Sequence, residues 1–155
     1  MADKKIYLDV CCLCRPFDDQ TIHRTRIETE AVIEILKRCM NDWELVGSEV
    51  IESEIDQIQD PERRENVENL LQLVRSRIVI DGTTEKQARI FHTMGLDPFD
   101  ALHLACAKKA GAIFLTTDDA LIKMIKKHAD KITTGAHNPV QWLMEVTMDA
   151  GKDAE

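Results

Sequence analysis

The stretch from Gly95 to Asp119, GLDPFDALHLACAKKAGAIFLTTDD, constrains the fold more than any other part of the chain. Asp97 is a favourable N-cap, and Pro98 suits the first helical position. Gly111 can take the left-handed conformation that ends a helix after Lys109 and Ala110. The pattern therefore predicts a helix that begins after Asp97 and stops abruptly at Gly111.

The same stretch continues into an apolar run and then into two acids. Ala112 to Thr116 has the length of a short buried strand, and Asp118 and Asp119 follow it closely. Asp9 takes a similar place, directly after the apolar residues 6–8 near the N-terminus. Ligands bind at the carboxyl ends of strands in an open α/β sheet. These acids are therefore candidates for chemistry.

Strand and helix patterns alternate along the rest of the chain. Strands are predicted at 5–9, 43–46, 77–80 and 112–116, with a weaker one near Ile132. Helices are predicted at about 21–40, after Ser48, after Asp60-Pro61, from a Thr84 cap to Met94, at 98–110, at about 120–129 and after Asn138-Pro139. The cysteine-rich segment after Asp9 is expected to be a loop. Alternation of this kind predicts an α/β fold with a mainly parallel central sheet and helices on both faces.

A chain of 155 residues is long enough for one domain with its own core. We expect that domain at residues 1–148, followed by a polar C-terminal tail at 149–155. The sequence has no apolar stretch of transmembrane length and no signal-peptide core, so the expected compartment is the cytoplasm. The formal net charge of −8 argues against a protein that coats nucleic acid passively. It does not exclude an enzyme that meets phosphate through local basic side chains.

Five cysteines are present, and Cys11, Cys12 and Cys14 lie close together. Without a secretory signal they are expected to be reduced and packed in the interior. A zinc site is poorly supported, because no second cysteine pair or histidine pair completes four ligands.

Four acids, Asp9, Glu54, Asp100 and Asp118, are candidate ligands for a hard cation such as Mg²⁺ or Mn²⁺, which prefers oxygen donors. Each has a purely structural alternative. Asp100 lies in the first turn of its helix, Asp118 or Asp119 can cap the next helix, and Glu54 can belong to a solvated helix face. Asp9 has no cap to make unless a helix follows at once. His103, one turn after Asp100, either reaches the site or is a packed core histidine.

The chain as a whole resembles the PIN domain, the metal-dependent nuclease fold of VapC-type toxins. The resemblance rests on IYLDV near the start, SEVIESEI in the middle and DPFDALHLACAKKAGAIFLTTDD near the end, and it covers roughly residues 4 to 146. The third block is the most specific of the three.

The resemblance implies that the acidic cluster of the family falls on Asp9, Glu54, Asp100 and Asp118, with Asp119 as a helper or substitute. It also implies supporting hydroxyl groups at Thr116 and Thr117. Aligning the middle block on Glu54, and not on Glu52, is the least secure step. Many members have Asn two residues after the first Asp, where this chain has Cys11.

Two functions follow as hypotheses. The first, implied by the resemblance, is a Mg²⁺- or Mn²⁺-dependent endoribonuclease that leaves a 5′-phosphate and acts as the toxin of a toxin–antitoxin pair. Its partners would be an RNA substrate, a cognate antitoxin and a second copy of the chain, with no membrane; the apolar positions of helix 21–40 are candidate contributors to a homodimer. The alternative is a non-catalytic scaffold of the same fold that binds RNA or a protein.

Overall fold

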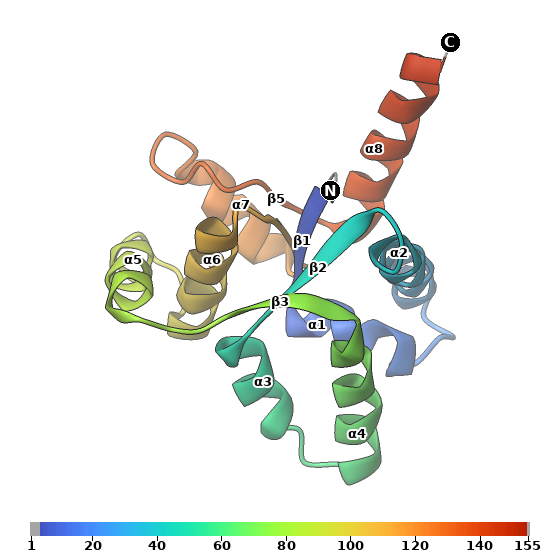
Figure 1. Cartoon of the computed structure of the whole chain (residues 1–155), viewed down its shortest axis with the longest axis horizontal. Coiled ribbons are helices and arrows are strands. Elements are labelled where there is room, and N and C mark those ends of the chain that lie inside the picture. The colour runs from blue at the N-terminus through green and yellow to red at the C-terminus, as the bar shows by residue number, and fades with distance from the viewer. Residues whose placement is uncertain (1–3, 155) are drawn as a thin grey trace.

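The computed structural model describes residues 4–154. Its centre is a five-stranded sheet in the order β3-β2-β1-β4-β5, and all four strand pairs are parallel (Figure 1). The strands are β1 (Lys4–Leu8), β2 (Trp43–Ser48), β3 (Val74–Ile78), β4 (Ile113–Leu115) and β5 (Ala136–His137). The predicted α/β class and parallel sheet are confirmed.

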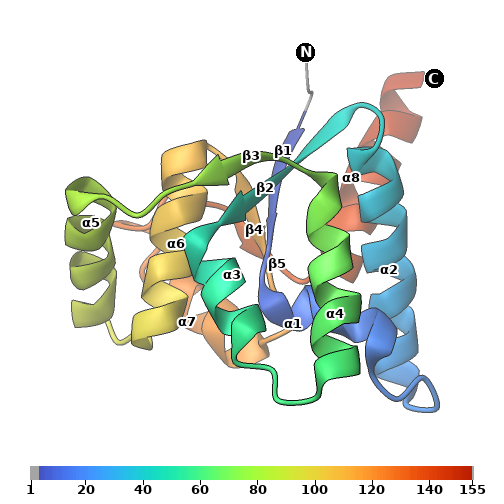
Figure 2. The ribbon, with the colours of Figure 1, turned by 60° about the horizontal axis from the view of Figure 1, so that its bottom comes forward.

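Helices connect the strands and cover both sides of the sheet. They are α1 (Val10–Cys14), α2 (His23–Cys39), α3 (Glu49–Asp56), α4 (Pro61–Leu70), α5 (Gly82–Thr93), α6 (Pro98–Ala110), α7 (Asp119–Lys127) and α8 (Pro139–Ala154), with 3₁₀ turns at Arg15–Phe17 and Leu71–Leu73. α2 and α8 pack together on one side, and α6 packs on the other with α5 beyond it (Figure 1). α1, α3 and α4 gather at one end of the sheet (Figure 2).

The core follows from strands that are apolar on both faces, as parallel strands covered by helices must be. Ile6, Tyr7 and Leu8 of β1 are fully buried. Trp43 and Trp142 pack with ring centroids 5.2 Å apart and join β2 to α8, so both tryptophans are core residues.

The signals at the ends of α6 act as the sequence predicts. The Asp97 carboxylate accepts a hydrogen bond of 3.0 Å from the backbone N–H of Phe99, and Gly111 ends the helix with φ at 66°. Only glycine takes this conformation without a steric cost. These two ends fix Asp100 in the first turn of α6 and His103 one turn later.

Several local predictions were wrong. The segment after Asp9 is helix α1, not a loop. Helix α5 begins at Gly82 because Asp81 caps it by accepting hydrogen bonds from both the backbone and the hydroxyl of Thr84. β3 lies at 74–78 because its pairing with β2 sets its register, and β5 lies at 136–137, whereas Ile132 is a buried loop residue. α8 runs from Pro139 to Ala154, and the boundary expected at residue 149 stays a prediction.

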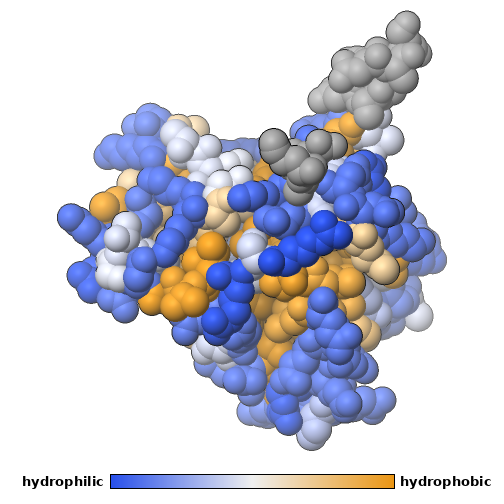
Figure 3. Space-filling view, in the orientation of Figure 1, coloured by the Kyte–Doolittle hydropathy of each residue, from blue (hydrophilic) through white to orange (hydrophobic). Residues whose placement is uncertain are grey.

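β3 forms one edge of the sheet. The face of the molecule seen in Figure 3 has an apolar region in its middle, crossed by hydrophilic side chains. Arg75 and Arg77 are exposed on β3, and charged side chains on an edge strand hinder further strand pairing.

All five cysteines are free, and every one except the partly exposed Cys11 is buried. Within residues 4–154, none of the helices has the length and apolar character needed to cross a membrane.

Candidate active site

The sheet topology brings two of the predicted acids to the ends of neighbouring strands. From β1, the chain builds β2 and β3 on one side and β4 and β5 on the other. The boundary between β1 and β4 is therefore the point at which strand order reverses, where parallel sheets open a crevice for ligands. Asp9 follows β1 directly, and Asp118 follows β4 after Thr116 and Thr117.

Asp9 is held by a side chain from the neighbouring strand. It precedes helix α1, yet its carboxylate makes no capping hydrogen bond there. Instead Asp9 Oδ2 accepts a hydrogen bond of 2.8 Å from the Thr116 hydroxyl, which in turn accepts one of 3.2 Å from the backbone N–H of Asp118. Thr116 thus joins the two strand ends, and Asp9 is 8% exposed with its Oδ1 not engaged by this contact.

Glu54, and not Glu52, lies beside Asp9. Glu54 Oε1 is 2.6 Å from Nε2 of His103, which is 3.9 Å from Oδ1 of Asp9. Glu52 lies elsewhere on α3 and makes a two-pronged ion pair with Arg77, at 2.6 and 2.8 Å. Of the two glutamates, Glu54 is therefore the one beside Asp9, and its role as a cation ligand stays a prediction.

Asp100 is half-buried in the first turn of α6, and its environment disfavours ionisation. Burial is the main cause of a rise in the pKa of Asp100 to about 6. Repulsion from Asp9, Asp97 and Asp118 adds to the rise, and His103 opposes it. Asp100 therefore lies within the electrostatic field of Asp9 and Asp118.

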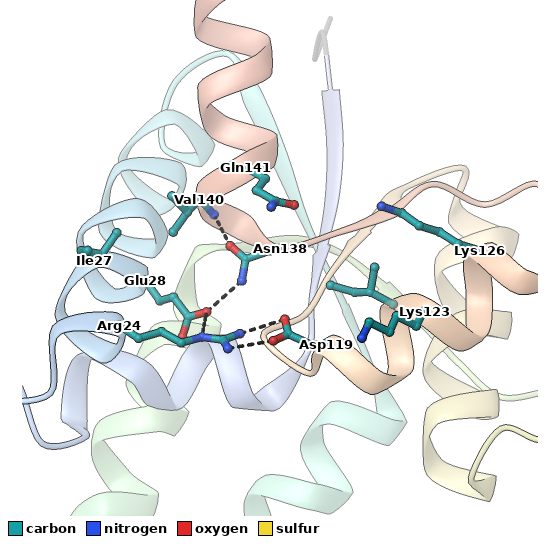
Figure 4. A pocket seen from close by; sticks show the side chains of 10 residues that line it. Arg24, Ile27, Glu28, Asp119, Lys123, Lys126, Asn138, Val140 and Gln141 are labelled. Carbon is teal, nitrogen blue, oxygen red and sulfur yellow. Dashed lines mark hydrogen bonds and ion pairs between the residues drawn. The ribbon is translucent and has the colours of Figure 1, made fainter.

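Asp118 and Asp119 have different partners. Asp118 is exposed, and its Oδ1 caps α7 by accepting a hydrogen bond of 3.1 Å from the backbone N–H of Leu121. Asp119 makes a two-pronged ion pair with Arg24, at 2.8 and 2.9 Å, at the margin of a neighbouring pocket (Figure 4). The predicted capping role is therefore real for Asp118, and Asp119 is already paired with a cation.

A buried acid anchors the loop that carries Asp118. Glu28 of α2 is 2% exposed and accepts hydrogen bonds from Arg15, Arg24 and Asn138. The two arginines also donate to Thr117, at its hydroxyl and its backbone oxygen, each at 3.0 Å. The loop between β4 and α7 is therefore fixed to α2 by charge-assisted hydrogen bonds.

Cys11 takes part in the same loop contacts. Its sulfur is 3.5 Å from the Thr116 hydroxyl and accepts a hydrogen bond of 3.4 Å from the backbone N–H of Thr117. The thiol therefore contacts the hydroxyl that holds Asp9.

Sequence reasoning gave no role to Tyr7, and it assigned Ser48 only the cap of α3. In the structure the Tyr7 hydroxyl lies 2.6 Å from Nδ1 of His103 and 2.7 Å from the Ser48 hydroxyl. The spacing held a usable signal. Tyr7 lies on β1, two residues before Asp9, and His103 is three residues after Asp100 on one face of α6.

These donors fit a hard divalent cation. A carboxylate oxygen of Asp9 and one of Glu54 lie within 4.8 Å of each other and of a ring nitrogen of His103. Asp100 adds a carboxylate whose ionisation a nearby cation would favour. A set dominated by carboxylate oxygens, partly open to water, matches Mg²⁺ or Mn²⁺ better than a thiophilic metal.

Comparison with known proteins agrees with this architecture. The sequence profile of the PIN domain matches residues 6–127. Two solved structures share the fold: FitAcB from Neisseria gonorrhoeae, with 17% identity, a TM-score of 0.57 and coverage of 86% of this chain and 97% of that one, and FitAB bound to an IR36 DNA fragment, with 17% identity, a TM-score of 0.55 and coverage of 87% and 95%. No curated protein matches the chain. The profile match spans most of the sequence, and on that basis this chain belongs to the PIN domain family.

Proposed function

We propose that this protein is a Mg²⁺- or Mn²⁺-dependent endoribonuclease that hydrolyses RNA phosphodiester bonds. The observation that carries the proposal is the convergence of Asp9 and Glu54 around His103, with Asp100 close enough to Asp9 for their repulsion to contribute to its pKa of about 6. Carboxylates gathered in this way repel one another and repel RNA, so the arrangement would gain stability when a cation joins it.

Each predicted residue has a separate role in this proposal. Asp9, Glu54, Asp100 and Asp118 would hold the cation directly or through water, and Thr116 keeps Asp9 in place through its 2.8 Å hydrogen bond. When bound, such an ion activates water and neutralises charge on the phosphodiester. Thr117 supports the loop that presents Asp118. Asp119, the fifth acid of the predicted set, would help indirectly, by tying the start of α7 to Arg24.

A pocket beside Asp119 supports RNA as the substrate. It encloses about 510 Å³ between α2, α7 and the start of α8, and Lys123 and Lys126 lie on its α7 wall (Figure 4). Phosphates on either side of the scissile bond need cations within one or two nucleotide lengths of the acids. In a chain with a net charge of −8, these two lysines are suitably located for that contact.

We further propose that the protein is the toxin of a toxin–antitoxin pair, acts in the cytoplasm and forms a homodimer. The support is the resemblance to VapC-type toxins and the fold shared with FitAB. An antitoxin would neutralise the enzyme by covering the acidic crevice.

Cleavage of a mixed RNA pool with Mn²⁺ tests the reaction directly. We expect wild-type protein to cut RNA and to stop when EDTA is added, and Asp9→Asn to lose at least about 100-fold in rate, because the cation loses an anchoring carboxylate. Asp130→Asn is the matched control, since Asp130 is an exposed acid in the loop beyond α7. Cleavage that survives both EDTA and Asp9→Asn would refute the proposal.

The second candidate is a non-catalytic scaffold, which Cys11 in place of the usual Asn favours. Thermal denaturation with and without Mn²⁺ separates the two. A ligand present at about 100 times its Kd stabilises the native state by about 2.7 kcal/mol, which corresponds to a Tm rise of about 5–10 °C at this chain length. Equal Tm values with and without Mn²⁺, together with absent cleavage, would favour the scaffold.

A further inference from the structure

His103 is fully buried, yet both of its ring nitrogens have polar partners. Nε2 lies 2.6 Å from Oε1 of Glu54, and Nδ1 lies 2.6 Å from the Tyr7 hydroxyl. An ionised carboxylate can only accept a hydrogen bond, so Nε2 carries the proton in the contact with Glu54.

The remaining hydrogen bonds then run in one direction. With a neutral imidazole, Nδ1 is an acceptor and the Tyr7 hydroxyl donates to it. The Tyr7 oxygen accepts from Ser48 at 2.7 Å, and the Ser48 oxygen accepts from the backbone N–H of Ile51 at 3.1 Å. Every member is buried up to His103, and each hydroxyl both donates and accepts. We call this chain from Ser48 through Tyr7 and His103 to Glu54 the buried relay.

The buried relay connects the three elements that carry the clustered acids. Tyr7 lies on β1, which leads into Asp9, and Ser48 caps α3, which carries Glu54. His103 lies on α6, one turn after Asp100. If His103 only helped to pack the core, any two polar partners would satisfy its ring nitrogens. Here one partner is the carboxylate of a proposed cation ligand, and Asp9 is 3.9 Å away.

We propose that His103 is a positioning residue that fixes the Glu54 carboxylate toward Asp9 for cation binding. This inference rests on the proposed function. Glu54 extends from a short surface helix on a flexible side chain, and a short charge-assisted hydrogen bond from a rigid buried donor removes much of that freedom. Outer partners of metal ligands typically account for 10- to 100-fold in affinity or activity.

The test compares His103→Leu, which removes the donor, with His103→Gln, whose amide can donate to Glu54 from nearly the same place. Free Mn²⁺ measured by EPR gives the Kd, and we expect His103→Leu to weaken binding by about 10- to 100-fold and His103→Gln to recover most of it. Thr84→Val is the control, because it removes the side-chain hydrogen bond from the buried Thr84 hydroxyl to Asp81, the N-cap of α5. Unchanged Mn²⁺ affinity in folded His103→Leu would overturn the proposal.

Two further measurements keep the proposal testable. If His103→Leu does not fold, Tyr7→Phe takes its place: it removes the hydroxyl that orients the imidazole and should weaken Mn²⁺ binding several-fold, whereas wild-type affinity contradicts the role. A ¹⁴N coupling typical of a directly bound histidine, in the pulsed EPR spectrum of the Mn²⁺ complex, would make His103 a ligand and also overturn it.

A metal-free crystal structure separates this inference from the proposed function. Glu54 should leave its wild-type position in His103→Leu and keep it in His103→Gln; an unmoved Glu54 in His103→Leu refutes positioning. Wild-type protein that neither binds Mn²⁺ nor cleaves RNA refutes the proposed function alone, and the position of Glu54 still decides what His103 does.

Discussion

Asp9 and Asp100 are close to each other but lie in different environments. Asp9 receives a 2.8 Å hydrogen bond from Thr116, which holds its carboxylate in place. Burial, together with repulsion from nearby acids, raises the pKa of Asp100 to about 6. A cation bound as proposed would relieve that repulsion.

This difference predicts how stability depends on pH. Because the folded-state pKa of Asp100 is raised from 3.8 to about 6, the folded protein binds this proton more tightly than the unfolded chain. Its contribution to stability is therefore present below about pH 4 and lost as the pH rises through about 6. In EDTA at pH 7.5, Asp100→Asn should be more stable than wild type by about 1 kcal/mol, a value reduced for solvent screening at this half-exposed group.

Urea denaturation of both proteins at pH 4 and pH 7.5 measures this effect, and the two should be nearly equal in stability at pH 4. With Mn²⁺ at pH 7.5 the order should reverse, because wild type binds the ion better. An Asp100→Asn variant that is less stable than wild type in EDTA at pH 7.5 would contradict the assignment.

At the scale of secondary-structure elements, α2 and α7 form two walls of the pocket beside Asp119. The Arg24–Asp119 ion pair joins the N-terminal ends of these two helices, and the buried Glu28 holds Arg24 and Arg15 against the loop before α7. One wall of the resulting pocket carries Lys123 and Lys126, which lie on the same side of α7.

We predict that the double variant Lys123→Ala/Lys126→Ala binds RNA more weakly while its kcat changes little. Each lost phosphate contact should reduce the slope of log K against log salt by about 0.7 for single-stranded RNA, so the double variant should lose about 1.4. Lys37→Ala is the control, because Lys37 is an exposed lysine in the last turn of α2, at the opposite end from Arg24. An unchanged salt slope in the double variant would exclude this pocket as the path of the RNA.

At the scale of the whole molecule, α2 uses most of its apolar side chains inside the fold. Ala31, Val32, Ile35, Leu36 and Cys39 are buried, so of the apolar positions first considered for a homodimer only Ile27 is exposed. A different set of apolar residues is exposed at α2 and its two ends. Ile33 of α2 is 40% exposed, and Ile22 and Met40, which flank the helix, are 54% and 61% exposed. Their spacing places the three along one stripe.

If the protein dimerises as proposed, this stripe is where α2 contributes. Ile33→Glu/Met40→Glu should then weaken the dimer by more than about 10-fold, because two charges would be buried without partners at the interface. Analytical ultracentrifugation of wild type at micromolar concentration comes first, and Ile90→Glu, at an exposed position of α5, is the control. A monomeric wild type would contradict dimerisation itself. A dimer that withstands the double substitution would show that the interface does not include this stripe.

Local features of the sequence determined much of this protein. The cap at Asp97, the stop at Gly111 and the apolar runs of β1 and β4 each depend on residues a few positions apart, and they suffice for the parallel fold and for acids at its strand ends. The errors arose where local signals competed. Thr84 resembles a cap, but Asp81 caps the helix first, and the apolar residue Ile132 is buried in a loop without joining the sheet.

Tertiary structure alone decided what each acid does. The Thr116–Asp9, His103–Glu54 and Arg24–Asp119 contacts join residues 107, 49 and 95 positions apart in sequence. A carboxylate is a free ligand, a cap or half of an ion pair according to which donor reaches it, and that depends on the packing of strands and helices. The sequence therefore determined which residues are candidate cation ligands, and the fold determined which of them already serve as a helix cap or in an ion pair.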